Sequence, residues 1–222
     1  MDPQTSLADL ATAIPAASRV FQRRQLDFCC GGRTSLAEAC AQRGLDVDDV
    51  LREIEEGAGG EDDVRWDERT APEIIDHILT RYHAPLREEL PRLRDMAVRV
   101  EERHADKEAC PKRLAALLDT MIGEVESHLG KEEQILFPMI KAGRGGMAQG
   151  PIRVMEQEHD EHGANLGRIR KLTRDFQPPE EACPTWKALY LGLEQLEFDL
   201  MKHIHLENAV LFPKVLMGAE AG

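Results

Sequence analysis

The chain has 222 residues, of which 42% are apolar and 31% charged, and its net charge is −13. This length allows one large domain, or one of ordinary size with a small one. The negative charge argues against nucleic acid as a partner, because phosphates would be repelled. No run approaches the ~18 apolar residues of a membrane span, so no membrane contact is expected. Aromatic residues make up only 5% and helix-favouring residues dominate, which predicts an all-α fold.

Five cysteines form no spacing that is typical of a disulfide framework, and no N-terminal apolar block resembles a signal peptide. An odd number of cysteines without export features favours a reducing compartment. We therefore expect a cytoplasmic protein.

The first part of the chain predicts short helices. Residues 6–24 have a helical apolar period broken at Pro15, residues 35–38 form a capping box, and a further short helix is expected over 46–56. A Gly- and Asp-rich stretch follows at 57–63. We predict a small helical N-terminal domain over 1–57, a linker over 58–70, and a second domain over 71–222.

Four longer helical patterns follow, over about residues 72–104, 112–141, 151–176 and 185–216. Prolines stand at or near their starts, where the first helical turn tolerates them. The connections are short, which favours neighbours that run in opposite directions. The second domain is therefore predicted to be an up-down-up-down four-helix bundle.

An internal repeat lies on the second and fourth of these helices. Residues 128–138 and 203–213 both read His-x-x-x-Glu-x-x-[Ile/Val]-Leu-Phe-Pro, 75 residues apart. The first and third helices carry His83 and His159, which are 76 residues apart. The pattern indicates a duplicated helical hairpin.

The repeat predicts a metal site, because residues four apart share one helix face. The apolar residues Ile135, Met139 and Val210 continue the same faces, so the repeated acids are expected in the core, where an unpaired carboxylate is costly. Four imidazoles and two carboxylates are too many for one tetrahedral zinc and suit two ions bridged by the carboxylates; iron, manganese and zinc all accept such donors. The predicted ligands are His83, His128, Glu132, His159, His203 and Glu207.

Other interpretations stay open at this point. The histidines could be satisfied core residues, and the Glu-x-x-His pairs that end at His104 and His159 also fit a ferritin-like site. His162 and His205 are out of register with the predicted ligands and are expected at the surface. Four nearby acids, Glu126, Glu158, Asp160 and Glu161, are candidates for holding the ligand imidazoles in place, although solvated helix faces would also explain them.

At these motifs the chain resembles the Repair of Iron Centres family of hemerythrin-like proteins. The resemblance is carried by Asp-Phe-Cys-Cys-Gly-Gly at 27–32, Glu-Ile-Ile-Asp-His-Ile at 73–78, Arg-Tyr-His at 81–83, Lys-Glu-Glu-Gln-Ile-Leu-Phe-Pro at 131–138 and Glu-His-Asp-Glu at 158–161. It implies two non-haem iron ions with carboxylate and oxo bridges, on the same six ligands. It also implies repair of iron–sulfur proteins that nitrosative or oxidative stress has damaged.

The family often has a further histidine at the position of His104, as a fifth imidazole ligand. Here that residue lies 21 positions beyond His83, about 30 Å along a straight helix. Only a bend, for example at Pro85 or Pro91, would bring it to the metals. His104 therefore remains an open candidate.

The resemblance favours a protein that stores labile iron and supplies it to damaged clusters. Two alternatives remain: reduction of nitric oxide to nitrous oxide at a diferrous pair, which would make the protein an enzyme, and binding or sensing of nitric oxide or dioxygen. The sequence leaves a homodimer open. Cys29 and Cys30, beside two glycines, are predicted to be accessible thiols that react with nitric oxide or pass on iron or electrons, although two small core residues would also fit.

Overall fold

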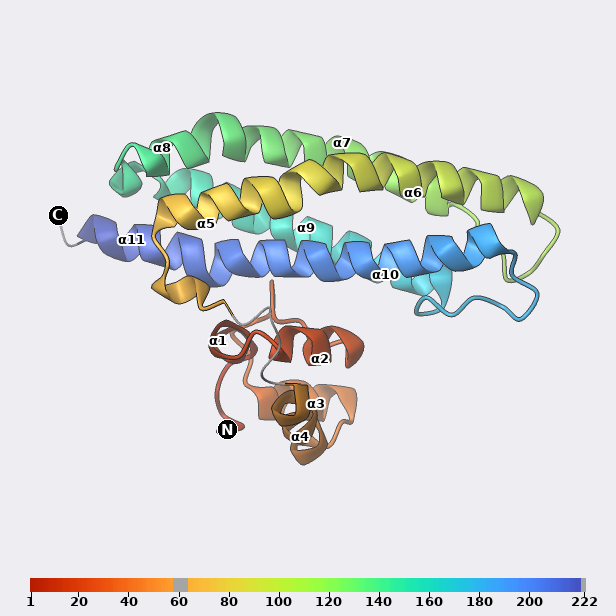
Figure 1. The fold of residues 1–222 in the computed structure, drawn as a ribbon, viewed down its shortest axis with the longest axis horizontal. Helices are drawn as coiled ribbons and strands as arrows, with labels where there is room; N and C mark the ends of the chain where they lie inside the picture. Colours follow the sequence, from red (N-terminus) through yellow and green to blue (C-terminus); the bar gives the residue numbers. More distant parts are fainter. Residues whose placement is uncertain (58–63, 221–222) are drawn as a thin grey trace.

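The computed structural model describes residues 1–57 and 64–220, and within them the regular structure is helical, with no β-strand (Figure 1). Four long rods lie side by side, and successive rods run in opposite directions (Figure 1). The predicted all-α bundle, preceded by a small helical part, is therefore confirmed. None of the helices described combines the length and apolarity of a membrane span.

Three of the four rods are interrupted by a π-helical turn. The first rod is α5 (Ala71–Ile78), η2 (Leu79–His83) and α6 (Ala84–Arg103), and the second is α7 (Leu114–Lys131), η3 (Glu132–Leu136) and α8 (Phe137–Lys141). A short 3-10 turn, η4 (Gly145–Met147), leads to the uninterrupted third rod, α9 (Gln149–Thr173). The fourth is α10 (Pro184–His205), η5 (Leu206–Leu211) and α11 (Phe212–Glu220).

Each π turn carries a predicted metal ligand. His83 ends η2, Glu132 begins η3, and Glu207 lies in η5. A π turn holds one residue more than an α turn, so it rotates the side chains that follow, and such turns often mark functional sites. For this reason Ile135, which was predicted to face the core, is 54% exposed, and that prediction was wrong. Val210 is buried as expected.

The bundle core is divided into two apolar clusters, and every rod passes from one to the other at a predicted ligand. The second rod contributes Leu129 to the first cluster and Leu136 to the second, on either side of Glu132. The third rod does the same around His159, with Met155 in the second cluster. The predicted ligands therefore form one polar level of the bundle between the two apolar clusters.

The N-terminal part has four short helices: α1 (Leu7–Ala13), α2 (Ala17–Arg23), α3 (Leu36–Arg43) and α4 (Val47–Gly57). Ser6 and Ser35 cap α1 and α3 through their hydroxyl groups. These helices enclose an apolar cluster of their own that includes Phe21 and Phe28. Residues 58–63 of the predicted linker lie outside the described residues, and the next ones form a 3-10 turn, η1 (Trp66–Glu68). The predicted domain limits remain a prediction.

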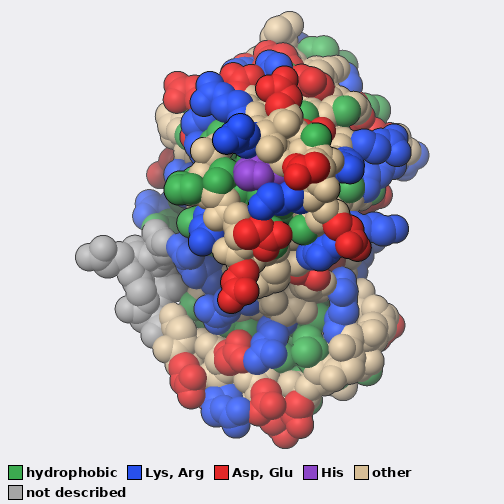
Figure 2. Space-filling model, turned by 90° about the vertical axis from the view of Figure 1, so that its right-hand side faces the viewer, with side chains coloured by type: hydrophobic (Ala, Val, Ile, Leu, Met, Phe, Trp, Pro, Cys, Tyr) green, Lys and Arg blue, Asp and Glu red, His purple; other side chains and the backbone are tan. Residues whose placement is uncertain are grey.

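The N-terminal helices pack beneath α10 (Figure 1). The ring of His205 lies against Phe28, and its Nε2 is 3.2 Å from Thr12 Oγ1. His205 is only 5% exposed, so its predicted place at the surface was wrong; the N-terminal part covers it. On the outer face shown in Figure 2, basic and acidic side chains are interspersed.

Candidate metal centre

Six buried side chains converge at the polar level of the bundle. The Nε2 atoms of His83 and His203 are 3.1 Å apart, and those of His128 and His159 are 3.2 Å apart. The donor atoms form two groups, each a pair of histidines with the same two glutamates. The groups are His83, Glu132, His203, Glu207 and His128, Glu132, His159, Glu207. The structure thus brings together all six predicted residues.

Each glutamate lies between the two histidine pairs. Glu132 Oε2 is 3.3 Å from His83 Nε2 and 3.5 Å from His128 Nε2. Glu207 reaches the other histidine of each pair, with 3.1 Å from Oε1 to His203 Nε2 and 3.1 Å from Oε2 to His159 Nε2. Two ligands at about 2.1 Å from one ion and at right angles lie about 3 Å apart. These spacings fit two ions with both carboxylates as bridges.

Hydrogen bonds on the outer side of three imidazoles select the tautomer that binds metal. The Nδ1 atoms of His83 and His128 lie 2.8 Å from Glu133 and 2.9 Å from Glu158. A carboxylate only accepts, so each Nδ1 carries the proton and each Nε2 turns a lone pair to the centre. His159 Nδ1 is 2.8 Å from Asn208 Oδ1, which accepts in the same way. Such outer partners orient metal-binding histidines.

The two outer carboxylates are balanced by bases, whereas His203 lacks such support. Arg87 binds Glu133 at 2.8 Å, and Lys131 pairs with Glu158. His203 Nδ1 has no hydrogen-bond partner, and the ring stacks on Tyr82 at 5.6 Å between centroids. The four imidazoles are therefore held unequally.

Burial sets the protonation of the inner groups. It lowers the pKa of His83 to about 4 and that of His128 to about 2, and a neighbouring histidine adds to each shift. Burial and the charge of Glu207 raise the pKa of Glu132 well above its usual value. Although burial opposes it, contact with His203 and His159 holds the pKa of Glu207 well below its usual value. His83 and His128 are thus neutral donors at pH 7.

Glu132 provides the test of whether metal ions fit. It is 0% exposed, and neither carboxylate oxygen has a hydrogen-bond partner. The nearest imidazoles turn lone pairs towards it, so they donate nothing. An unsatisfied buried polar group costs about 1–3 kcal/mol, and cations shared with the imidazoles remove that cost. The donor set therefore fits two metal ions.

Comparisons with known proteins agree with this geometry. Residues 74–215 match the hemerythrin HHE cation binding domain, and residues 3–58 match a domain of unknown function (DUF542). The chain is 51% identical over 214 residues to the iron-sulfur cluster repair protein YtfE of Citrobacter koseri, with 96% of each chain covered. The proteins of that name from Escherichia coli O1:K1 / APEC and Escherichia fergusonii give the same figures. The chain belongs to the Repair of Iron Centres family. The predicted family and its hemerythrin-like di-iron cofactor are confirmed, and the buried cluster offers donors able to hold two metal ions.

The outer partners differ between the two halves of this family member. Glu133 and Asn208 each follow a glutamate of the repeat, and Glu158 and Tyr82 each precede a histidine of the inner pairs. His83 and His128 thus have carboxylate partners, whereas His159 has an amide and His203 an aromatic ring. Glu158 was among the acidic candidates, but Glu133 and Asn208 were missed. The position after each repeated glutamate was the signal that could have found them.

His104 and His162 lie outside both donor groups. His104, at the end of α6, has its Nε2 3.3 Å from Cys183 Sγ and its ring against Trp186. His162 is 2% exposed and meets the ring of His128 edge-on at 5.0 Å. Its predicted place at the surface was wrong, because positions 159, 162 and 166 share the inner face of α9.

The cysteine pair contacts the back of the metal centre. Cys30 Sγ lies 3.4 Å from the backbone oxygen of His159. Asn208 Nδ2 donates to the backbone oxygen of Cys29 at 3.1 Å, while its Oδ1 accepts from His159. The N-terminal part therefore reaches His159 in two ways, directly through Cys30 and by way of the side chain of Asn208.

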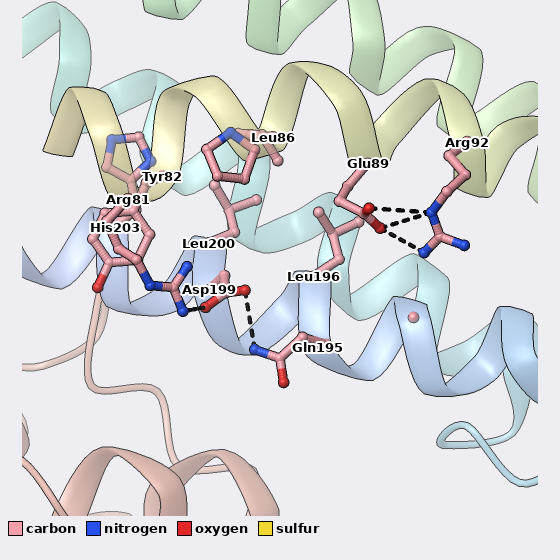
Figure 3. Close-up of a pocket in the computed structure, with 12 residues that line it drawn as sticks. Arg81, Tyr82, Leu86, Glu89, Arg92, Gln195, Leu196, Asp199, Leu200 and His203 are labelled. Carbon is pink, nitrogen blue, oxygen red and sulfur yellow. Dashed lines mark hydrogen bonds and ion pairs between the residues drawn. The ribbon is translucent and has the colours of Figure 1, made fainter. Parts of the chain in front are cut away.

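A cavity of about 330 Å³ lies between α6 and α10, with His203 in its wall (Figure 3). Leu86, Leu196 and Leu200 make its apolar lining. Arg81 and Asp199 form an ion pair of 3.0 Å beside it. The cavity offers a small uncharged molecule space beside the centre.

Proposed function

We propose that this protein repairs damaged iron–sulfur clusters in the cytoplasm by supplying iron from its dinuclear centre. The observation that carries the proposal is the pair of buried glutamates shared by two pairs of histidines. The relatives named as iron–sulfur cluster repair proteins support the role. All five cysteines are free thiols, which supports a reducing compartment.

In this proposal, His83 and His203 hold one iron and His128 and His159 hold the other, while the two glutamates bridge them. His104 takes no part, since it packs against Trp186 instead. The irons supply exchangeable metal, and the chain supplies histidine Nε2 lone pairs that already point towards the centre. The ordered imidazoles make binding favourable without a large rearrangement.

The unequal support of the imidazoles suggests which iron leaves first. His203 Nδ1 has no hydrogen-bond partner, so on its outer side this ligand is held only by stacking on Tyr82. His128 and His159, by contrast, each have an outer partner. The iron between His83 and His203 is therefore the one supplied to clients.

The cavity beside His203 favours a second candidate function. Its apolar lining suits nitric oxide or dioxygen better than a charged substrate. Two irons could hold two nitric oxide molecules in reacting geometry. Anaerobic exposure of the reduced protein to nitric oxide, with gas analysis, tests this; the absence of nitrous oxide at stoichiometric dose rules out the reductase activity.

The main proposal is tested with a client protein whose cluster has been damaged by nitric oxide. Iron-loaded wild type should restore client activity, and the double variant with Glu132→Leu and Glu207→Leu should not. Glu102→Gln, an exposed acid on α6, is the matched control and should behave as wild type. Equal recovery with wild type and the double variant would refute iron supply from this centre.

A further inference from the structure

The loop between α2 and α3 gathers three side chains of types that can bind a metal ion, away from the dinuclear centre. Asp27, Cys29 and Cys30 each offer a donor atom, and these atoms lie within 4.8 Å of one another. Phe28, which is 0% exposed, anchors the loop in the N-terminal core. Asp27 is exposed and Cys30 half-buried, whereas Cys29 is buried, so the three donors lie between the interior and the edge of the protein.

The spacing of these donors fits one tetrahedral ion. The two Sγ atoms are 3.7 Å apart, and Cys29 Sγ is 3.3 Å from Asp27 Oδ1. Two thiolates at about 2.3 Å from a tetrahedral metal lie ~3.8 Å apart, and a thiolate and a carboxylate oxygen ~3.5 Å apart. Little movement would therefore bring all three donors onto one cation.

The two glycines after the cysteines allow the loop to fold back onto Asp27. Asp27 Oδ1 accepts the backbone N–H groups of Cys29 and Cys30 at 3.1 and 2.9 Å. A Cβ at Gly31 would lie 3.1 Å from Asp27 Oδ2, and one at Gly32 would lie 2.5 Å from the Phe28 carbonyl oxygen. The motif thus holds a carboxylate against two thiols.

The surroundings of the loop favour a cation with room to enter. A cleft of about 750 Å³ borders both cysteines, and its wall includes the acids Asp9, Glu156 and Asp160 with a single Arg33. On the α9 side, Gly163 has no side chain to fill the space beside Cys30 Sγ. Three protein donors leave a fourth position of a tetrahedral ion open, as in sites that exchange a ligand.

The loop is also joined to the dinuclear centre. Cys30 Sγ is 3.4 Å from the backbone oxygen of His159, and Asn208 links the Cys29 carbonyl to the His159 ring. His159 therefore contacts the cysteine loop through its backbone oxygen and offers its ring to the dinuclear centre.

We propose that Asp27, Cys29 and Cys30 form a second, mononuclear site for a divalent transition-metal ion, on which iron from the dinuclear centre is handed to a client. Thiolates with one carboxylate suit Fe²⁺ or Zn²⁺. Binding breaks two S–H bonds, forms two metal–sulfur bonds and releases two protons to solvent, and no electron is transferred. The cation site stands on its own geometry, whereas the hand-over role rests on the proposed iron supply.

The site is tested on full-length, iron-loaded protein with reduced thiols, under anaerobic conditions, with Co²⁺ as the probe. Wild type should bind one further equivalent with a thiolate-to-cobalt charge-transfer band. Cys29→Ser with Cys30→Ser should keep its two irons and lose the band, and Asp27→Asn should bind Co²⁺ about 10–100-fold more weakly. Cys183→Ser, a half-buried thiol elsewhere, is the matched control and should keep the band.

Absence of the band in wild type, or its persistence in the double serine variant, would overturn the site. Thermal unfolding checks the fold of each variant, and Cys30→Ser alone replaces the double variant if that one unfolds. Transfer of ⁵⁷Fe to a client is followed in the same samples. Transfer by the double variant as fast as by wild type would overturn the hand-over role. No transfer by wild type with the cobalt band intact would refute the proposed function and support the site.

Discussion

Replacing Glu132 by leucine should change stability in opposite directions with and without metal. In metal-free protein the buried carboxyl has no geometrically well-formed hydrogen bond, and burial raises its pKa well above the usual value, so leucine removes a cost of about 1–3 kcal/mol. For a chain of this size, 1 kcal/mol corresponds to roughly 2–4 °C in melting temperature. Metal-free Glu132→Leu should therefore melt several degrees above metal-free wild type.

With iron bound the order should reverse, because the variant lacks a bridging carboxylate. Glu207→Leu is the matched control: its Oε1 forms a hydrogen bond of 3.1 Å with His203 Nε2, which the substitution breaks, so it should stabilise neither form. Denaturant unfolding in the presence of chelator, and again after iron loading, measures both effects. If metal-free Glu132→Leu is destabilised as much as Glu207→Leu, the assignment of Glu132 as an unsatisfied acid that needs cations is refuted.

Three further predictions follow from contacts around the centre. Asn208→Asp should keep the acceptor for His159 and retain both irons, whereas Asn208→Ala should weaken iron binding about 10–100-fold. Competition with a chelator measures both affinities, and equal affinity of the two variants would contradict the orienting role of Asn208. Gly32→Ala should lower the free energy of unfolding by about 1–3 kcal/mol, because its Cβ would lie 2.5 Å from the carbonyl oxygen of Phe28. Gly123→Ala, which has open space around its Cβ, should not lower it. Equal melting temperatures of the two variants would disprove the clash. Burial, helped by nearby Arg81 and Lys202, lowers the pKa of His77, so the unfolded chain binds more protons and stability should fall as pH drops below about 6.5. His77→Phe should reduce that fall in unfolding free energy, and an unchanged pH profile would show that His77 does not contribute.

The helical pattern and the repeat were readable in the sequence because both depend on local spacing. Apolar residues at helical intervals indicated the four rods, and the duplicated motif indicated His128 with Glu132 and His203 with Glu207. Residues four apart share a face of any helix, whatever packs against it. The pairing of His83 with His203, and of His128 with His159, depends on which rods are neighbours, so it appears only in the fold.

The errors had tertiary causes. The π turn after Lys131 rotated Ile135 outwards, and an α-helical period cannot foresee that extra residue. His205 was assigned to the surface because it is out of register with the predicted ligands, but a separate set of helices covers it. Contacts between segments far apart in the chain leave no periodic signal.

The sequence by itself determined the class of fold, the family and a set of donors suited to two irons, since these follow from residue type and spacing along single helices. Only the tertiary structure decided which outer groups hold each imidazole and where the cysteine loop lies. Those relations join different rods and the N-terminal part, as when Asn208 links Cys29 to His159. They arise from packing in three dimensions, which brings together residues that the chain keeps far apart.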